Sequence, residues 1–554
     1  MKTTIKDRFI LIFIFSALSV IFFFNYQDYG IGIEEHFQRK IGFYWLSQVL
    51  SSFSLEELFQ EAQRRLSDIE TFTPNLFPIN EYGYYGVIFD LPMALIETLL
   101  KVEEPKNYFF LRHMFNYFFF LISAFYFFKI IELRFKNFFL SIIALLIYCL
   151  TPRIFGNSFF DGKDIFFLTV MTINFYCLMK FQNKRTILNL IIFALFCSFS
   201  TSTRIIGILI PISWLFIMFL SSLNSKILKK NLIFIFVFIF FYFIFLFLQW
   251  PYLWSLEFKN LLNFFDPFFK AMNPIVYFNG DYFQSKYLPL IYLPKWIFLT
   301  TPFFYLFMSI FGFYFFFKRI FNRLCALEDN GKEFLQNLWR GQNEKFDFFL
   351  ILNFTLIFVI YFSKNLALLS GWRHFYFLHF YIVYFSIFTL YLLFLKNNKY
   401  LLLSIFGKVI LVLFLFEMIY KLYIYHPYQS LYFNNLTNYV KKSLFEIDTQ
   451  SLSRSEALKE ILKDGSSTDR KIKIGTASWT PLEDARSLID KKYWSKFIFL
   501  GTANLEDADY IYTNFYYEVD IRYNNKYVIP KQFKLYKTLY IDGIKVYSIF
   551  KKER

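Results

Sequence analysis

Long runs of Phe, Leu and Ile, separated by short polar segments, occupy most of the first 422 residues of the chain. About 20 apolar residues in a helix cross the hydrocarbon core of a bilayer, and fewer suffice where a neighbour covers one end. The pattern predicts eleven membrane spans, of which the fifth and sixth are short. They lie near 9–26, 109–128, 138–151, 165–180, 187–200, 205–221, 231–250, 302–317, 347–363, 374–395 and 401–422.

The polar segment between the first two spans, residues 27–108, contains two amphipathic patterns. In "SLEELFQEAQRRLSDI" a capping box of Ser54 and Glu57 precedes apolar residues at helical spacing. In "EEHFQRKIGFYWLSQVL" the aromatic residues Tyr44 and Trp45 suit the membrane interface. We therefore expect two interfacial helices on the membrane surface. The helix that begins with "EEHFQ" holds Glu34 and Glu35 close to the bilayer.

The tail, residues 423–554, has charges throughout and no run of membrane length. "SRSEALKEILK" predicts a capped helix that begins at Ser453. "KIKIG", "KFIFLG" and "DYIYT" predict strands, and "FKLYKTLYI" and "IKVYSIF" predict a hairpin joined through Asp542 and Gly543. The fold class is therefore mainly α: a polytopic helical membrane domain, residues 1–422, followed by a small extramembrane α/β domain, residues 423–554.

Composition supports the membrane class, because 56% of the residues are hydrophobic and 85 are Phe. The net charge of +17 comes from Lys and Arg scattered through short loops, which argues against a nucleic-acid partner and for a topology signal. With a cytoplasmic N-terminus on an uncleaved anchor, the basic loops fall inside. The segments 27–108, 151–164, 201–204, 251–301, 364–373 and the tail then face outward. The four cysteines form no disulfide or zinc pattern.

Polar residues recur at the outer ends of the spans. A charge at the bilayer centre costs about 2.5 to 3.5 kcal/mol, so such residues pair or line a wet cavity. Taken alone, each residue has a simpler explanation. A lone Arg can extend its charge to the membrane interface, the two glutamates can mark the start of a helix, and Asp161 and Asp164 can form a turn and cap the next helix. Together they favour one shared outer cavity. The set is Glu34, Glu35, Arg112, His113, Arg153, Asp161, Lys163, Asp164, Arg204, Arg373, His374 and His426.

Several sequence blocks resemble a known superfamily. They are "IEEHFQ", "TPRIFGNSFFDGKDIFF", "STSTRIIGILIP", "LPLIYLPKWIFLTTP", "GWRHFYF" and "HPYQSLYFNNL". Their order over about residues 25–440 resembles bacterial glycosyltransferases related to dolichyl-phosphate-mannose protein mannosyltransferases, of the GT-C superfamily. The lipid A aminoarabinose transferase is a more distant relative. The likeness weakens in the tail, where "FEIDTQSLSRSEAL" departs from the relatives and leaves its role in acceptor choice open.

The resemblance implies an acidic base in the first outer loop, where the family pair is Asp then Glu. Here Glu34 matches the Asp and Glu35 the Glu, and the choice between them stays open. It also implies Asp164 as a second acidic group, and a divalent cation remains possible beside it. The implied substrate-binding residues, mainly phosphate holders, are Arg153, Lys163, Arg204, Arg373, His374 and His426; no residue is assigned as a metal ligand.

The expected function is a mannosyltransferase-like membrane glycosyltransferase of the bacterial inner membrane and cell envelope. It would transfer a sugar from a polyprenyl-phosphate donor to a protein, lipid or glycan acceptor on the periplasmic face. A carboxylate would take the acceptor's proton, and cations or a metal would hold the departing phosphate. One alternative is a lipid or sugar transporter, although we find no internal repeat. Another is a non-catalytic membrane protein of envelope assembly.

Overall fold

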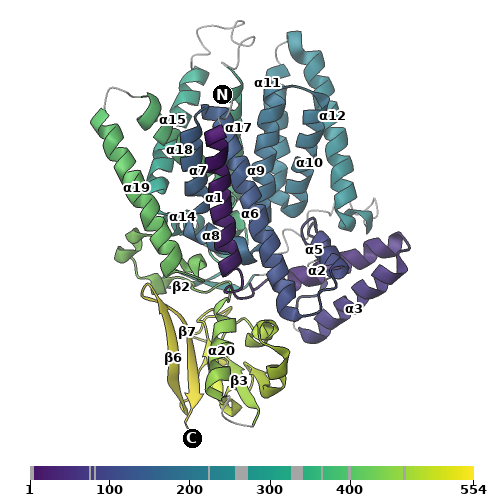
Figure 1. The fold of residues 1–554 in the computed structure, drawn as a ribbon, viewed down its shortest axis with the longest axis vertical. Helices are drawn as coiled ribbons and strands as arrows, with labels where there is room; N and C mark the ends of the chain where they lie inside the picture. The colour runs from purple at the N-terminus through teal and green to yellow at the C-terminus, as the bar shows by residue number, and fades with distance from the viewer. Residues whose placement is uncertain are drawn as a thin grey trace.

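Long helices packed side by side form the larger part of the molecule, and a smaller α/β unit lies at one end of them (Figure 1). The computed structural model describes residues 5–73, 76–79, 83–222, 225–255, 273–325, 341–363, 366–396, 401–465 and 470–553. The mainly α polytopic class predicted from the sequence is confirmed.

All eleven predicted spans are helical. Within the described residues, eight helices are long and apolar enough to cross a membrane, or nine if the bent pair α7–α8 is one span. The other two predicted spans are α10, which is a shorter apolar helix, and α19. The bundle helices are α1 (Ile5–Asn25), α6 (Pro105–Phe135), α7 (Phe138–Cys149), α8 (Pro152–Phe160), α9 (Gly162–Asn183), α10 (Ile187–Thr203), α11 (Leu209–Ser222), α12 (Ser225–Gln249), α15 (Phe303–Cys325), α17 (Gln342–Ser363), α18 (Leu378–Tyr391) and α19 (Leu401–Ile424).

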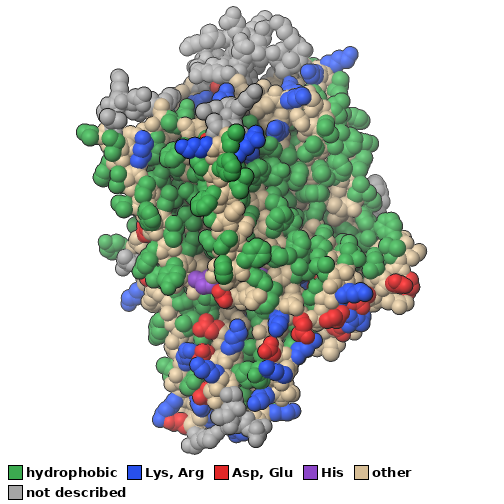
Figure 2. All heavy atoms as spheres, in the orientation of Figure 1, with side chains coloured by type: hydrophobic (Ala, Val, Ile, Leu, Met, Phe, Trp, Pro, Cys, Tyr) green, Lys and Arg blue, Asp and Glu red, His purple; other side chains and the backbone are tan. Residues whose placement is uncertain are grey.

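The apolar helices differ in what covers them. In the apolar stretch of α9, 89% is buried inside the protein, where the helix packs against α6 and α10, whereas only 11% of the apolar stretch of α1 is buried. Large side chains such as Phe236, Phe243 and Phe247 of α12 point outward. Figure 2 shows the result as a broad hydrophobic band, with Lys and Arg at one end and mixed charges at the other. Lipid rather than protein covers this band, because so large an apolar surface is not stable in water.

The third span bends sharply at the end that was predicted to face outward. Helix α7 ends at Cys149, and α8 begins at Pro152 at an angle of 65°. Proline lacks the amide hydrogen that a helix interior needs, but the first turn does not use it, so Pro152 can begin a new helix. Most of the segment 151–164 is therefore helical, and Asp161 then caps α9 by accepting a hydrogen bond from the Asp164 amide at 3.2 Å.

The segment between the first two spans contains α2 (Glu35–Ser52), α3 (Glu56–Phe72) and α5 (Asp90–Leu99). The apolar side of α3 packs on α2 and α5: Ala62 and Ile69 bury against Phe43, Leu46 and Ala94. Protein therefore covers the face of α3 that was expected to lie on the membrane. A buried ion-pair network also joins the three helices, in which Glu97 of α5 binds Arg39 of α2 at 2.5 Å and Arg65 of α3 at 3.2 Å.

The predicted capping box at Ser54 is wrong. Ser54 has a left-handed backbone, with a φ of +55°, and the helix begins at Glu56 after Leu55, with no side-chain cap. An N-cap residue needs an extended backbone to aim its oxygen at the first turn. The tight turn that ends α2, in which the Leu55 amide donates to the Leu50 carbonyl, places Ser54 elsewhere.

The predicted α/β unit is present at the C-terminus, with α20 (Ser453–Gly465) beside a five-stranded sheet of order β4-β3-β5-β7-β6. The strands are β3 (Ile472–Thr476), β4 (Phe497–Gly501), β5 (Tyr510–Thr513), β6 (Phe533–Ile541) and β7 (Ile544–Lys552). Strand β3 runs parallel to β4 and β5, and β7 runs antiparallel to β5 and β6. The β6–β7 turn has the predicted residues, both with positive φ: Asp542 at 48° and Gly543 at 73°.

A second hairpin, β1 (Ile275–Phe278) with β2 (Asp281–Gln284), was not predicted. It binds the start of the tail: Phe278 forms a bridge with Phe445, and the Tyr277 amide donates to Glu446 at 3.1 Å. The other carboxylate oxygen of Glu446 is buried without a hydrogen bond in the described part of the chain. Burial raises the pKa of Glu446 to about 8, against a smaller lowering by the Tyr277 amide.

We expect Glu446→Gln to change how stability depends on pH. Because the pKa is raised in the folded state, the folded protein binds the proton more tightly, and this contribution to stability is lost as pH rises from about 5 to about 8. The melting temperature of the variant should match that of the wild type near pH 5 and exceed it near pH 8. A thermal-shift series in detergent measures this, with the exposed Glu506→Gln as control. Parallel curves for wild type and Glu446→Gln would contradict the assignment.

Candidate active site

Charged side chains from distant parts of the chain meet where α9 begins. Arg373, in the short helix η5 (Arg373–Phe375), donates a hydrogen bond to Glu34 at 2.5 Å, although the two residues are 339 positions apart. The Nε atom of Arg373 lies 3.7 Å from Asp164 of α9. Asp164 also forms an ion pair with Arg204, which follows α10. We call these four side chains, Glu34, Asp164, Arg204 and Arg373, the charge cluster.

Two further predicted residues border the charge cluster. The Lys163 ammonium lies 3.3 Å from the centre of the Tyr85 ring, a cation–π contact. His374 lies 3.4 Å from the guanidinium of Arg373, measured between Nε2 and Nη2. Burial and the charge of Arg373 lower the pKa of His374 well below its usual value, so this ring is neutral at neutral pH. The largest positive charge acting on Glu34 is that of Arg373.

The pKa values of Glu34, which precedes α2, and Asp161, which precedes α9, are shifted in opposite directions. Protein atoms surround Glu34, although 37% of its side-chain surface is exposed, and this burial alone would raise its pKa. The charges of Arg373 and Lys163 outweigh it and lower the pKa to about 2. For Asp161 burial prevails over Arg373, and its pKa rises to about 7. The site therefore holds one carboxylate that stays charged and one carboxyl group that titrates near neutrality.

Several polar atoms of the site are buried without a hydrogen bond from any described residue. They are one carboxylate oxygen each of Asp161 and Asp164 and the Nε atoms of Arg204 and Arg373. Buried polar groups are normally hydrogen-bonded, and exceptions need an explanation. Two guanidinium groups with open donors suit an anion with several oxygens, such as a phosphate.

Glu35 is in a different environment from its neighbour Glu34. Its side chain is buried, and one carboxylate oxygen accepts a hydrogen bond from the Gly32 amide at 2.7 Å. The same oxygen lies 3.2 Å from Nε2 of His113 in α6. Glu35 therefore holds the turn that precedes α2, whereas Glu34 reaches the charge cluster.

Two of the predicted substrate-binding residues neither belong to the charge cluster nor border it. Arg153 is buried beside Trp296 and Phe433, donates to the Tyr432 carbonyl at 3.2 Å, and forms no ion pair with a described acidic residue. His426 lies 2.9 Å from Asp28.

The prediction placed Asp161 in the shared outer cavity but gave it no catalytic or binding role, although "DGKD" puts it three residues before Asp164. It also missed Asp90, which binds Arg112 at 3.1 Å. Nothing in the sequence around Asp90 marks this pairing.

No group of three or more His, Cys, Asp or Glu side chains that could hold a metal ion occurs within the described ranges. Around Asp164, the positions next to the carboxylate are occupied by Arg204 and Arg373.

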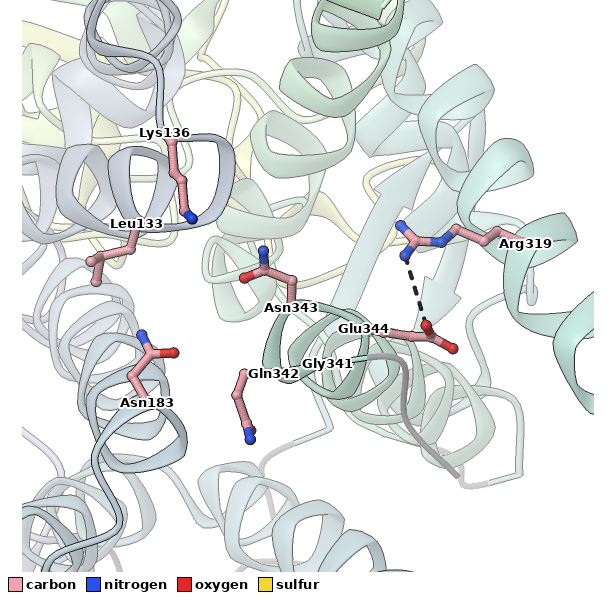
Figure 3. A pocket seen from close by; sticks show the side chains of 8 residues that line it. All are labelled: Leu133, Lys136, Asn183, Arg319, Gly341, Gln342, Asn343 and Glu344. Atoms are coloured by element: carbon pink, nitrogen blue, oxygen red, sulfur yellow. Dashed lines mark ion pairs between the residues drawn. The ribbon is translucent and has the colours of Figure 1, made fainter. Parts of the chain in front are cut away.

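A cavity of about 450 Å³ lies at the opposite end of the bundle (Figure 3). It is lined by Leu133, Lys136, Asn183, Arg319, Gly341, Gln342, Asn343 and Glu344. Asp164 and Asn183 lie near opposite ends of α9, about 30 Å apart at the rise of an α-helix. The cavity and the charge cluster therefore belong to opposite sides of the membrane domain.

No family model matches the sequence, and no curated protein matches it. Among solved structures, the chain is similar to the crystal structure of ArnT from Cupriavidus metallidurans bound to undecaprenyl phosphate. The match covers 98% of this chain and 98% of that chain, with 10% sequence identity and a TM-score of 0.42. At this level of similarity, the chemistry has to be argued from the residues of the present chain.

Proposed function

We propose that this protein is a membrane glycosyltransferase that moves a sugar from a polyprenyl-phosphate donor to an acceptor hydroxyl. The observation that carries the proposal is the charge cluster, in which Glu34 and Asp164 share the guanidinium of Arg373. A carboxylate beside two arginines at the end of the membrane helices supplies both requirements of this reaction. It offers a proton acceptor and a cationic site for the departing phosphate.

Glu34 is the proposed base. The acceptor oxygen attacks the anomeric carbon, the bond from that carbon to the phosphate oxygen breaks, and the acceptor proton passes to the Glu34 carboxylate. Its pKa of about 2 would make it a weak base, but Arg373 supplies the largest lowering. As the phosphate gains charge, it competes for Arg373, and the basicity of Glu34 rises at the step that needs it.

Arg204, Arg373 and Lys163 are the proposed phosphate holders. The Nε donors of Arg204 and Arg373 are buried and make no hydrogen bond to a described residue, and planar guanidinium donors match phosphate oxygens. Their place near the membrane boundary allows a prenyl chain to stay in the bilayer while its phosphate reaches the site. Arg153, which is buried and forms no ion pair with a described acidic residue, is a proposed second contact for the phosphate or the sugar.

The charge cluster is proposed to face the periplasm. Lys129, Arg134, Lys136, Lys184 and Arg185 lie at the other end of α6 and α9, and basic residues favour the cytoplasmic side. The C-terminal unit then also lies outside. A binding site at the helix ends rather than at the midplane disfavours a transporter, whose substrate sits near the bilayer centre.

Transfer in reconstituted membranes tests the proposal. The purified full-length chain is placed in liposomes with a radiolabelled polyprenyl-phosphate sugar and an envelope extract that contains protein, lipid and glycan acceptors. We expect label to leave the donor and appear in one acceptor class. Binding of the donor without any loss of label from it would favour a non-catalytic role, and movement of intact donor across the bilayer would favour a transporter.

A further inference from the structure

The segment that carries Glu34 is packed directly on the C-terminal unit. Residues Tyr29, Ile31 and Glu35 of this segment are almost fully buried. At Gly30 the two backbones touch so closely that a Cβ atom would overlap the Leu452 carbonyl. On its other side the segment packs on α8, where Tyr29 stacks on Phe159 with a centroid distance of 4.1 Å. The loop before α2 is therefore held between the membrane domain and the C-terminal unit.

Arg454, in the first turn of α20, makes the central contact of this interface. Its side chain is 1% exposed. It donates hydrogen bonds to the carbonyls of Ser451 at 3.0 Å, Pro481 at 2.9 Å and Ile31 at 3.1 Å, and it pairs with Asp484 at 3.1 Å. One guanidinium thus joins three places in the C-terminal unit to the backbone three residues before Glu34.

The peptide unit between Ile31 and Gly32 is fixed on both sides. Its carbonyl accepts from Arg454, and its amide donates to Glu35 at 2.7 Å. His36 adds a second contact to the same unit, with Nε2 at 3.0 Å from the Asp484 carbonyl. The C-terminal unit also reaches the segment that carries Arg373, because the hydroxyls of Tyr516 and Ser370 lie 3.4 Å apart.

We propose that Arg454 is a positioning residue for Glu34, through which the C-terminal unit sets the place of the carboxylate in the charge cluster. The inference rests on the proposed function for its consequence in catalysis, but its structural part is independent of it. Arg454 touches neither the charge cluster nor a reacting group. It acts on Glu34 through the Ile31–Gly32 peptide, and a displacement of about 1 Å at a reacting group can cost about 100-fold in rate.

Hydrogen–deuterium exchange tests the structural part on the full-length protein in nanodiscs. In Arg454→Ala we expect the amides of residues 31–36 to exchange faster than in wild type, while peptides from α9 and from β7 keep their protection. Arg454→Lys, which retains the charge but lacks the planar fork, should give an intermediate rate and serves if the alanine variant does not fold. The control is Arg470→Ala, an exposed arginine with an ion pair inside the same unit. Unchanged protection of residues 31–36 in both Arg454 variants overturns the proposal.

Kinetics test the consequence. Arg454→Ala should lower kcat by about 10- to 100-fold while the KM for the donor stays within about threefold, since the phosphate holders are untouched. Millimolar guanidinium should restore part of kcat in Arg454→Ala, but not in Glu34→Gln or wild type. An unchanged kcat, or a loss confined to the KM of the donor, refutes the positioning role. If wild type transfers no sugar, the proposed function fails, and the exchange experiment still decides on Arg454.

Discussion

Glu34→Gln should lower kcat for sugar transfer by about 100- to 10,000-fold, the usual contribution of a general base. The amide cannot take the acceptor proton, and it also releases Arg373 from its ion pair. Because the freed guanidinium can bind the phosphate without competition, the affinity for polyprenyl phosphate should stay the same or increase. Single-turnover rates and a binding isotherm on the same reconstituted preparation measure the two effects separately.

Glu35→Gln is the matched comparison for this experiment. Glu35 faces the Gly32 amide and His113 instead of the charge cluster. Its substitution should therefore lower the melting temperature, and it should lower kcat less than Glu34→Gln does. Full transfer by Glu34→Gln would remove the proposed base. A larger loss of kcat in Glu35→Gln than in Glu34→Gln would exchange the roles of the two residues.

Span positions could be predicted because membrane insertion depends directly on the length and apolarity of a run. The hairpin β1–β2 was missed although "NG" at Asn279 and Gly280 is a strong signal for a two-residue turn, here with φ values of 57° and 92°. Its strands are only four residues each, and they gain their partners from the distant Phe445 region. At Ser54 the opposite occurred: the motif matched, but the preceding turn determined the backbone.

The candidate site could be predicted as a set of charges at one end of the helices, because each charge needs a partner or a wet surface at that depth. The pairing within the set could not. Glu34 and Glu35 are adjacent, yet one binds Arg373 and the other lies against His113. Likewise Arg112 pairs with Asp90 and His426 with Asp28, which takes both away from the charge cluster. These choices depend on helix packing and rotation, which a single sequence does not reveal.

Arg373→Ala should reduce both chemistry and donor binding, since Arg373 links Glu34 to Asp164 and is a proposed phosphate holder. Removing one such stabilising donor costs about 100- to 1,000-fold in kcat. The pH–rate profile should shift as well. Arg373 supplies the largest lowering of the Glu34 pKa, so in the variant this pKa rises, and the rate should fall at a higher pH than in wild type as the medium is acidified. Initial rates between pH 4 and pH 8 measure the shift.

Two comparisons separate this effect from a general loss of charge. Arg373→Lys keeps the positive charge near Glu34 but lacks the fork that spans two acidic groups. The acid limb of its pH–rate profile should therefore lie closer to that of the wild type than the limb of the alanine variant does. Its kcat should lie between those of the alanine variant and the wild type. Arg522→Ala removes an exposed arginine from the C-terminal unit and should leave the profile unchanged. If Arg373→Ala lowers the rate without moving the acid limb, then Glu34 is not the group whose ionisation limits transfer, and the proposed coupling between phosphate and base is wrong.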